Sequence, residues 1–384
     1  MKNKPLVFNP SLSPFSLGVE LELQVLDGSS LLLTPRANEI IEDVGSESLK
    51  KEFFQSTLEV ITGVCSTVQD VQHDLLQSLI KVHASARKKV LKISSTGTHP
   101  EANYRERLIT PSARYHELAD RNQWLIRRMA VYGMHIHVGV TSADEAIKLN
   151  NFMLHFVPHL LALSASSPFW QRMDTGLTAA RPTMYESLPT SGIPYLVKNW
   201  SQFQKLYRDL LRSGSIENFR DLWWDVRPSP VIGTVEIRVC DEPARFTEAM
   251  AIVAFVHTLA HWFRDHAEEW ENGNKRFHRW MLRENKWRAI RYGRFAEVIS
   301  QRSKKPVKLT DDMLYWLEQC KPYTKALKYE MYLDTVRAIV ENGNSSERQY
   351  AVYKSSGDLH DVTRFNVREF EESLVVSDSG PEPE

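Results

Sequence analysis

The chain has 384 residues, 42% of them hydrophobic and 25% charged, which is ordinary for a globular protein. Its 48 basic and 48 acidic residues balance, so no global field favours nucleic acid or an anionic membrane as a partner. Three widely spaced cysteines without a Cys-x-x-Cys pair exclude a disulfide framework and a zinc knuckle. We expect a cytoplasmic protein, because the N-terminus lacks a signal-peptide core and no apolar run looks long enough to span a bilayer.

The first elements follow from hydrophobic periodicity. Alternating apolar and polar residues predict a strand over 15–27, and a β-branched run predicts a second strand over 58–64. Apolar residues at helical spacing predict a helix over 67–90. A short strand should follow and run into a loop within 91–100.

A helix with clear end signals is expected next. Thr110 resembles an N-cap with Pro111 at the first helical position, and Gly133 should stop this helix at about residue 132. The stretch "GMHIHVGV" then reads as a strand. Beyond it, Ser142 and Glu145 match a capping box for another helix.

The second half changes character. Residues 165–200 are rich in Ser, Pro, Gly and Thr, and a loop of this length is usually functional or disordered. A strand is expected over 230–241, and helices from Phe246 onward. We therefore predict one α+β domain over 1–375 with a helical C-terminal half, and an acidic, disordered tail over 376–384.

Three of the predicted strands carry charged or imidazole side chains at positions i and i+2, on one face of each strand. The pairs are Glu20 with Glu22, His135 with His137, and Glu236 with Arg238. Another β-type run holds Glu59, with Glu52 seven residues upstream. A single such strand is best interpreted as a solvated sheet face. Acids gathered from several strands instead indicate bound cations, and Mg²⁺ or Mn²⁺ suits oxygen ligands with one or two imidazoles.

A metal-bearing face opposed by arginines suits phosphoryl transfer, because guanidinium groups neutralise phosphate oxygens. The candidate arginines are Arg238, Arg227 and Arg181. The chain has no phosphate-binding GxxxxGK[ST] loop, no GxGxxG and no kinase motif set. If ATP binds, metals and arginines must hold it.

Five long motifs resemble the bacterial carboxylate–amine ligases, also called type-2 or weak glutamate–cysteine ligases. They are "FSLGVELELQV", "GTHP", "GMHIHVGV", "ALSASSPFWQRMDTGLTAARP" and "WWDVRPSPVIGTVEIRVCDEP". The resemblance implies a curved antiparallel sheet of the glutamine synthetase and glutamate–cysteine ligase type, with surrounding helices. In that family the concave face holds two or three divalent metals around ATP.

The resemblance also implies roles for single residues. The implied metal ligands are Glu20, Glu22, Glu52, Glu59, His135 and Glu236. His137 is expected to contact substrate or phosphate, and Arg238, with Arg227, to act on the transferring phosphoryl group. Arg181 and Arg238 are the expected ATP contacts. Gln55 departs from an acid found in some relatives and stays outside the metal set.

The implied reaction has two steps. A glutamate-like carboxylate attacks the γ-phosphate of ATP, and a cysteine-like amine then attacks the resulting acyl phosphate to form an amide. Metals and arginines would cancel the repulsion between carboxylate and triphosphate, and the 165–190 segment would act as a lid against water. The cofactors are ATP with Mg²⁺ or Mn²⁺. No nucleic acid or membrane partner is expected, and a homodimer is left open.

Other interpretations remain at this stage. A metal-dependent amidohydrolase also uses His-x-His on a strand, but it requires an α/β barrel. A phosphagen-type phosphotransferase would share the fold and stop at phosphoryl transfer, and a non-catalytic binding protein would bind without reacting. His155 and His159 could imitate a zinc pair, yet no acid stands beside them and Pro158 should interrupt their helix, so we expect a structural role.

Overall fold

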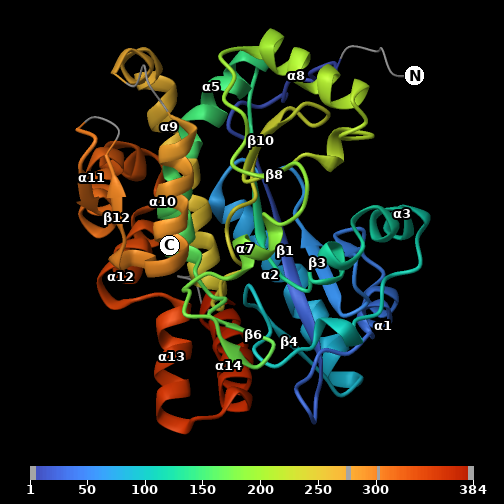
Figure 1. The fold of residues 1–384 in the computed structure, drawn as a ribbon. Helices are drawn as coiled ribbons and strands as arrows, with labels where there is room; N and C mark the ends of the chain where they lie inside the picture. Colours follow the sequence, from blue (N-terminus) through green and yellow to red (C-terminus); the bar gives the residue numbers. More distant parts are fainter. Residues whose placement is uncertain (1–5, 274–277, 301–302, 379–384) are drawn as a thin grey trace.

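The computed structural model describes residues 6–273, 278–300 and 303–378. Its centre is a seven-stranded antiparallel sheet in the order β10-β11-β5-β1-β3-β2, with β4 paired to the end of β1 (Figure 1). The strands are β1 (Leu17–Asp27), β2 (Leu49–Lys51), β3 (Thr57–Ile61), β4 (Leu91–Ser94), β5 (Met134–Gly139), β10 (Val226–Ser229) and β11 (Thr234–Ile237). The antiparallel sheet rules out the α/β barrel of an amidohydrolase.

Helices surround the sheet and make up most of the C-terminal half, which stands to the left of and below the strands in Figure 1. The α-helices are α1 (Ala37–Val44), α2 (Val68–Lys88), α3 (Ala113–Asn122), α4 (Trp124–Arg127), α5 (Ala143–Met153), α6 (Val157–Ser164), α7 (Arg181–Tyr185), α8 (Trp200–Arg212), α9 (Phe246–Gly273), α10 (Arg279–Tyr292), α11 (Leu309–Leu327), α12 (Glu330–Asn342), α13 (Ser345–Ser356) and α14 (Leu359–Asp378). Short 3₁₀ turns are η1 (Tyr104–Glu106), η2 (Leu154–Phe156), η3 (Phe219–Asp221) and η4 (Gly293–Phe295).

The sheet has one apolar face, and that face forms the core. Val19, Leu21 and Leu23 of β1 are at most 1% exposed, and helices α2, α5 and α9 cover this side of the sheet. Burying each such side chain contributes about 1.5–3 kcal/mol. The alternation in β1 therefore turns Glu20 and Glu22 to the opposite face, where the functional residues gather.

The structure confirms the expected α+β class, the antiparallel sheet and the helical C-terminal half. It also confirms the strands predicted over 15–27 and 58–64, which are β1 and β3, and the helix predicted over 67–90, which is α2. A helix does follow Thr110, but both of its predicted ends are wrong. Its N-cap is Ser112, because the Thr110 hydroxyl donates instead to the Glu52 carbonyl. The helix also ends early, at Asn122, because Gln123 adopts a left-handed φ of 49° that breaks the helical ladder.

Two other end signals are corrected. The capping box is half formed: the Ser142 hydroxyl accepts from the Glu145 amide at 3.1 Å, but the Glu145 carboxylate accepts from the amide of Thr141. The strand expected over 230–241 covers only 234–237. Residues 230–233 form the turn between β10 and β11, where Gly233 has a φ of +69° that suits glycine.

The segment 165–200 is not a plain loop. It contains α7 and three short strands, β6 (Phe169–Trp170), β7 (Met173–Asp174) and β8 (Ser191–Gly192), the last paired with β9 (Trp223–Trp224). Ser166 and Ser167 are fully buried, and the Ser167 hydroxyl donates to Asp241 at 2.6 Å. These bonds fix the start of the segment to Asp241, which lies just after the end of β11.

Two details change the expected C-terminal half. A short hairpin, β12 (Glu297–Ile299) with β13 (Pro306–Lys308), interrupts the helices. Helix α14 continues to Asp378, so the predicted tail begins as helix, and its residues 379–384 lie outside the described part of the chain. The division into one domain and a tail stays a prediction.

One helix contradicts the expectation that no run could span a bilayer. Residues Phe246–Asn272 are long and apolar enough to do so, with a mean hydropathy of 1.2. Inside the protein, however, 89% of this apolar stretch is buried against other elements, as in the core helix of a globular protein.

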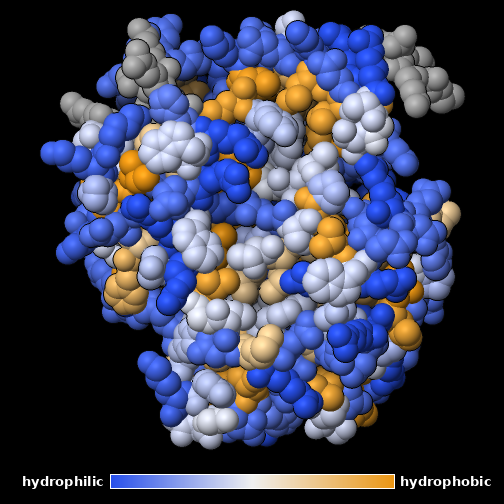
Figure 2. All heavy atoms as spheres, in the orientation of Figure 1, coloured by the Kyte–Doolittle hydropathy of each residue, from blue (hydrophilic) through white to orange (hydrophobic). Residues whose placement is uncertain are grey.

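The face seen in Figure 2 is mainly hydrophilic, with its orange side chains in small groups, the largest near α5 and α8.

Candidate functional site

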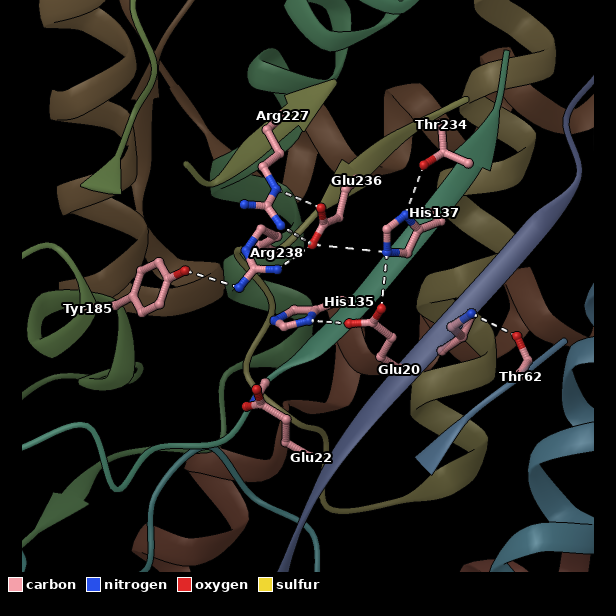
Figure 3. A network of polar contacts seen from close by, with 12 residues as sticks. Glu20, Glu22, Thr62, His135, His137, Tyr185, Arg227, Thr234, Glu236 and Arg238 are labelled. Carbon is pink, nitrogen blue, oxygen red and sulfur yellow. Dashed lines mark hydrogen bonds and ion pairs between the residues drawn. The ribbon is translucent and has the colours of Figure 1, made fainter. Parts of the chain in front are cut away.

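The strand register brings the two-histidine strand between two glutamates. Glu20 of β1 lies opposite His135 of β5, and Glu236 of β11 lies opposite His137. Opposed residues of antiparallel strands share a face, so all four side chains converge. The Glu20 carboxylate contacts His135 Nδ1 at 2.8 Å and His137 Nε2 at 3.3 Å (Figure 3).

On β5 and β11 this polar face is largely buried, so the interpretation of a solvated sheet face is wrong there, whereas Glu20 and Glu22 of β1 are partly exposed and line a cavity. His135, His137 and Glu236 are 4%, 7% and 2% exposed. Their burial is matched by specific partners: His137 Nδ1 lies 2.9 Å from the Thr234 hydroxyl, which fixes the ring, and its Nε2 faces Glu20 and lies 4.0 Å from Glu236. A face of charged groups kept from water needs such compensation.

Glu22, Glu52 and Glu59 form what we call the acid end of the face. Glu22 lies opposite Glu59 in the β1–β3 register, and one Glu22 oxygen accepts from the Gly133 amide at 2.6 Å. Burial and repulsion from Glu22 and Glu20 raise the pKa of Glu52 to about 7. Burial and repulsion from Glu52 likewise raise the pKa of Glu59 well above its ordinary value. No Lys or Arg forms an ion pair with the acid end in the described chain.

Arg227 and Arg238 form the arginine end, on the other side of Glu236. Arg227 Nε donates to Glu236 at 2.7 Å, and Arg238 NH1 also bonds this carboxylate. Burial alone would raise the pKa of Glu236, but the two arginines lower it. The other arm of Arg238 donates to the Tyr185 hydroxyl of α7 at 3.1 Å, so its planar fork is held at both tips (Figure 3).

A cavity of about 300 Å³ connects the two ends. Its charged lining consists of Glu20, Glu22, Glu52, Glu59, His135, Arg114, Arg181, Arg220, Arg227 and Arg238. His137 and Glu236 are outside this lining and lie behind the wall that Glu20 and Arg238 form. The position of His137 therefore favours a role in holding Glu20 and Glu236 over the expected direct contact with substrate.

Arg181 reaches the cavity but is already engaged. It is 3% exposed, and its terminal nitrogens donate to the carbonyls of Arg238 and Val239 at 3.4 Å. A Cβ on Gly133 would overlap its guanidinium, so the glycine makes room for this arginine. The geometry favours Arg181 as a residue that fixes the backbone of Arg238, rather than as the phosphate contact expected from the sequence.

Several cavity residues escaped the sequence reasoning. Arg114 of α3 and Arg220 of η3 are exposed at the cavity and have no ion pair among the described residues, so they are cations available to a ligand. Tyr185 and Trp223 also line the cavity, whereas Trp224 packs in a small apolar cluster. No local pattern distinguishes these residues from surface ones, since they gather only in the folded chain.

The residues fit a divalent cation. Two donor sets have one atom from each member within 4.8 Å of the others: Glu20, Glu59 and His135, and Glu20, His137 and Glu236. Burial and the neighbouring carboxylates raise the pKa values of Glu52 and Glu59, and the more distant Arg238 offsets this only in part. Carboxylate oxygens with one or two imidazoles match the ligand preferences of Mg²⁺ and Mn²⁺.

Comparison with known proteins gives matches over nearly the whole chain. Residues 16–364 match the sequence profile of glutamate–cysteine ligase family 2. A protein of Bdellovibrio bacteriovorus, provisionally named glutamate–cysteine ligase 2, is 39% identical over 98% of this chain and 99% of its own. One of the same name from Thermobifida fusca is 38% identical over 94% of this chain and 92% of its own.

Two solved structures share the fold. A glutamate–cysteine ligase of Francisella tularensis, in complex with AMP, superposes with a TM-score of 0.69 at 15% identity, covering 98% of this chain and 91% of that one. A bifunctional glutathione synthetase of Pasteurella multocida gives 0.65 at 14% identity and covers 95% of this chain and 52% of that one.

Proposed function

Because this chain belongs to glutamate–cysteine ligase family 2, it is an ATP-dependent carboxylate–amine ligase, and we propose that it forms a γ-glutamyl-type amide through an acyl phosphate. The observation that carries the proposal is the division of one cavity into an acid end and an arginine end. A carboxylate and a triphosphate repel each other, and this cavity offers positive groups to both substrates. Glu59 of the acid end, together with Glu20 and His135, would hold Mg²⁺ or Mn²⁺.

In the first step, a substrate carboxylate oxygen attacks the γ-phosphorus of ATP. The bond from that phosphorus to the β,γ-bridging oxygen breaks, and ADP leaves with the electron pair. A divalent cation, when bound, would neutralise phosphate oxygens and polarise the γ-phosphorus. Arg238 and Arg227 place two guanidinium groups at the cavity wall, where they would stabilise the charge on the phosphoryl oxygens.

In the second step, the amine nitrogen attacks the acyl carbon, the bond from that carbon to the phosphate oxygen breaks, and inorganic phosphate leaves. The amine also loses a proton, for which the carboxylates that line the cavity are the available acceptors. The segment that carries α7 borders the cavity through Tyr185, and it would help exclude the water that hydrolyses an acyl phosphate.

The finer parts of the proposal concern substrates, location and assembly. A glutamate-like acid and a cysteine-like amine follow from the family name, and the exposed Arg114 and Arg220 could pair with the carboxylates that both would carry. Location in the cytoplasm and assembly as a homodimer belong to the same proposal. Light scattering of the purified protein would test the dimer.

The decisive experiment is a substrate panel. Purified protein with ATP and Mg²⁺ is offered glutamate and other acids, each with and without cysteine and other amines, while ADP release and product mass are measured. We expect ADP release that depends on both substrates, and an amide product in which water has been lost. ADP release with a phosphorylated acceptor and no amide would instead indicate a phosphotransferase, and no metal-dependent ADP release would indicate a binding protein.

A further inference from the structure

Two histidines and an aspartate meet outside the sheet, where η2, α6 and α11 join. His155 lies in η2, His159 in α6 and Asp312 in the first turn of α11. One donor atom of each lies within 4.8 Å of the others. The sequence argued against a site here because no acid stood near the histidines. Folding supplies that acid from 153 residues away, and Pro158 begins α6 rather than interrupting it.

His159, at the centre of this cluster, is buried and its hydrogen-bonding groups are only partly satisfied. His159 is 1% exposed, and its Nε2 lies 2.7 Å from an oxygen of Asp312. Its other ring nitrogen, Nδ1, is also buried and has no hydrogen-bond partner in the described chain. A buried polar atom without a partner costs about 1–3 kcal/mol, so the hydrogen bond to Asp312 alone does not satisfy this imidazole.

The charge states suit metal binding. Burial, with the neighbouring His159, lowers the pKa of His155 to about 4, so this imidazole is neutral at pH 7. Burial opposes ionisation of Asp312, but its hydrogen bond with His159 lowers its pKa below the ordinary value. Neutral imidazole and ionised carboxylate are the forms that bind metal ions.

The surroundings form an aromatic shell with one open side. The ring of His155 lies 5.2 Å from that of Trp270 and 6.0 Å from that of Trp316, measured between centroids. Such a shell limits competition from water, which strengthens ionic and coordinate bonds inside it. The Asp312 side chain is 25% exposed, which leaves a route for an ion from solvent.

We propose that His155, His159 and Asp312 form a second metal site, selective for Zn²⁺ or a similar transition-metal ion, that ties α11 to η2 and α6. Two imidazoles and one carboxylate make a three-residue ligand set of the kind zinc uses, with a fourth position for water. This set differs from the oxygen-rich acid end, which suits Mg²⁺. Bonds of about 2 Å require the three donors to draw together on binding.

The test uses Co²⁺ as a coloured probe on the full-length protein. The protein is stripped with a chelator, the sheet site is saturated with Mg²⁺ and ADP, and Co²⁺ is titrated while bound metal and visible absorption are measured. The variants are Asp312→Asn, its exposed neighbour Asp311→Asn as the matched control, and His135→Gln as the sheet-site control. Zn²⁺ is then added to displace Co²⁺.

We expect wild type, Asp311→Asn and His135→Gln to bind one Co²⁺ per chain with the intense absorption of a tetrahedral site. Asp312→Asn should bind it at least about tenfold more weakly, and its ligase kcat should not change. Equal Co²⁺ binding by Asp312→Asn and wild type would overturn the proposal, as would loss of the signal in His135→Gln alone. A Zn²⁺-loaded wild-type crystal gives a test that needs no variant: anomalous density beside His159 supports the site, and density only at the sheet refutes it.

Discussion

The acid end of the sheet and the cluster around Lys286 both hold buried carboxylates, but only the second contains its own cation. Lys286 of α10 is 1% exposed, and its Nζ donates to both oxygens of Asp225 and to Glu186 at 2.7–2.8 Å. The acid end has no such partner among the described residues. A cluster that the chain neutralises can stabilise the fold, whereas one left negative needs a cation from solution.

The two clusters are mechanically connected. The Asp225 carbonyl accepts from the Arg238 amide at 2.8 Å, so the anchored aspartate fixes the backbone of this arginine. Glu186 directly follows Tyr185, whose hydroxyl holds the Arg238 side chain. Lys286 thus joins the C-terminal helices to both supports of Arg238. The cluster around Lys286 therefore positions the arginine end, whereas the acid end has no ion pair with a Lys or Arg of the described chain.

The largest effect is expected when the internal cation is removed. Lys286→Met leaves Asp225, which is 2% exposed, buried without its ion-pair partner, and breaking a buried ion pair in this way costs about 3–5 kcal/mol. Urea unfolding measures the free energy of unfolding, with the exposed Lys305→Met as a control that should change it by less than about 0.5 kcal/mol. Equal values for both variants would remove the distinction between the two clusters.

The acid end should show the reverse pattern. Glu59→Gln removes a metal donor, and we expect kcat to fall about a hundredfold or more, as at other sites that lose one electrostatic contact. Without metal, its melting temperature should stay level or rise, because repulsion with Glu52 disappears. ADP release and a melting curve in chelator measure the two quantities. A variant that keeps full activity but melts earlier would show that the acid end is structural.

A smaller effect should follow at the arginine end. Arg238→Lys keeps the charge but loses the fork that bonds Glu236 and Tyr185, so we expect kcat to fall about tenfold to a hundredfold. Tyr185→Phe removes only one support and should cost less than the lysine variant. Mg²⁺ affinity, measured by calorimetry, should stay within about threefold of wild type in both. A large loss of Mg²⁺ affinity would show that the arginine end contributes to metal binding and would contradict the division of the cavity into two ends.

The sequence predicted the faces of the strands but not how the strands meet. A period of two places Glu20 and Glu22 on one side of β1 whatever the neighbours are, so the charged pairs were visible in advance. The register that sets Glu20 against His135 and His137 against Glu236 depends on packing across the whole sheet. The family motifs supplied that information for the expected metal ligands, whose roles remain proposals.

Residues that act through distant partners could not be found in this way. In the sequence, Lys286 looks like any other polar residue of a helix. Only folding brings it against Asp225, which lies 61 positions earlier. Likewise, no local pattern around Asp312 indicates that it contacts His159 in the folded chain. Local signals also failed where a tertiary bond competed with them, as when the Thr110 hydroxyl bonded the Glu52 carbonyl instead of capping a helix. Long-range polar pairing is the information that local propensity lacks.

The smallest effect we expect is the contribution of Glu52 to the pH dependence of stability. The pKa of Glu52 is about 7 in the folded, metal-free protein, against an ordinary value of 4.5. Between these values the folded chain retains a proton that the unfolded chain has lost. Stability should therefore fall as pH rises through this window, with a slope for one group of at most about 1.4 kcal/mol per pH unit. Glu52→Gln, or saturating Mg²⁺, should reduce the slope by the contribution of Glu52, because in neither form does this side chain have a proton to lose. Urea midpoints measured in chelator across the window test this. If the glutamine variant retains the full slope, the titration belongs to another group, and the raised pKa of Glu52 is contradicted.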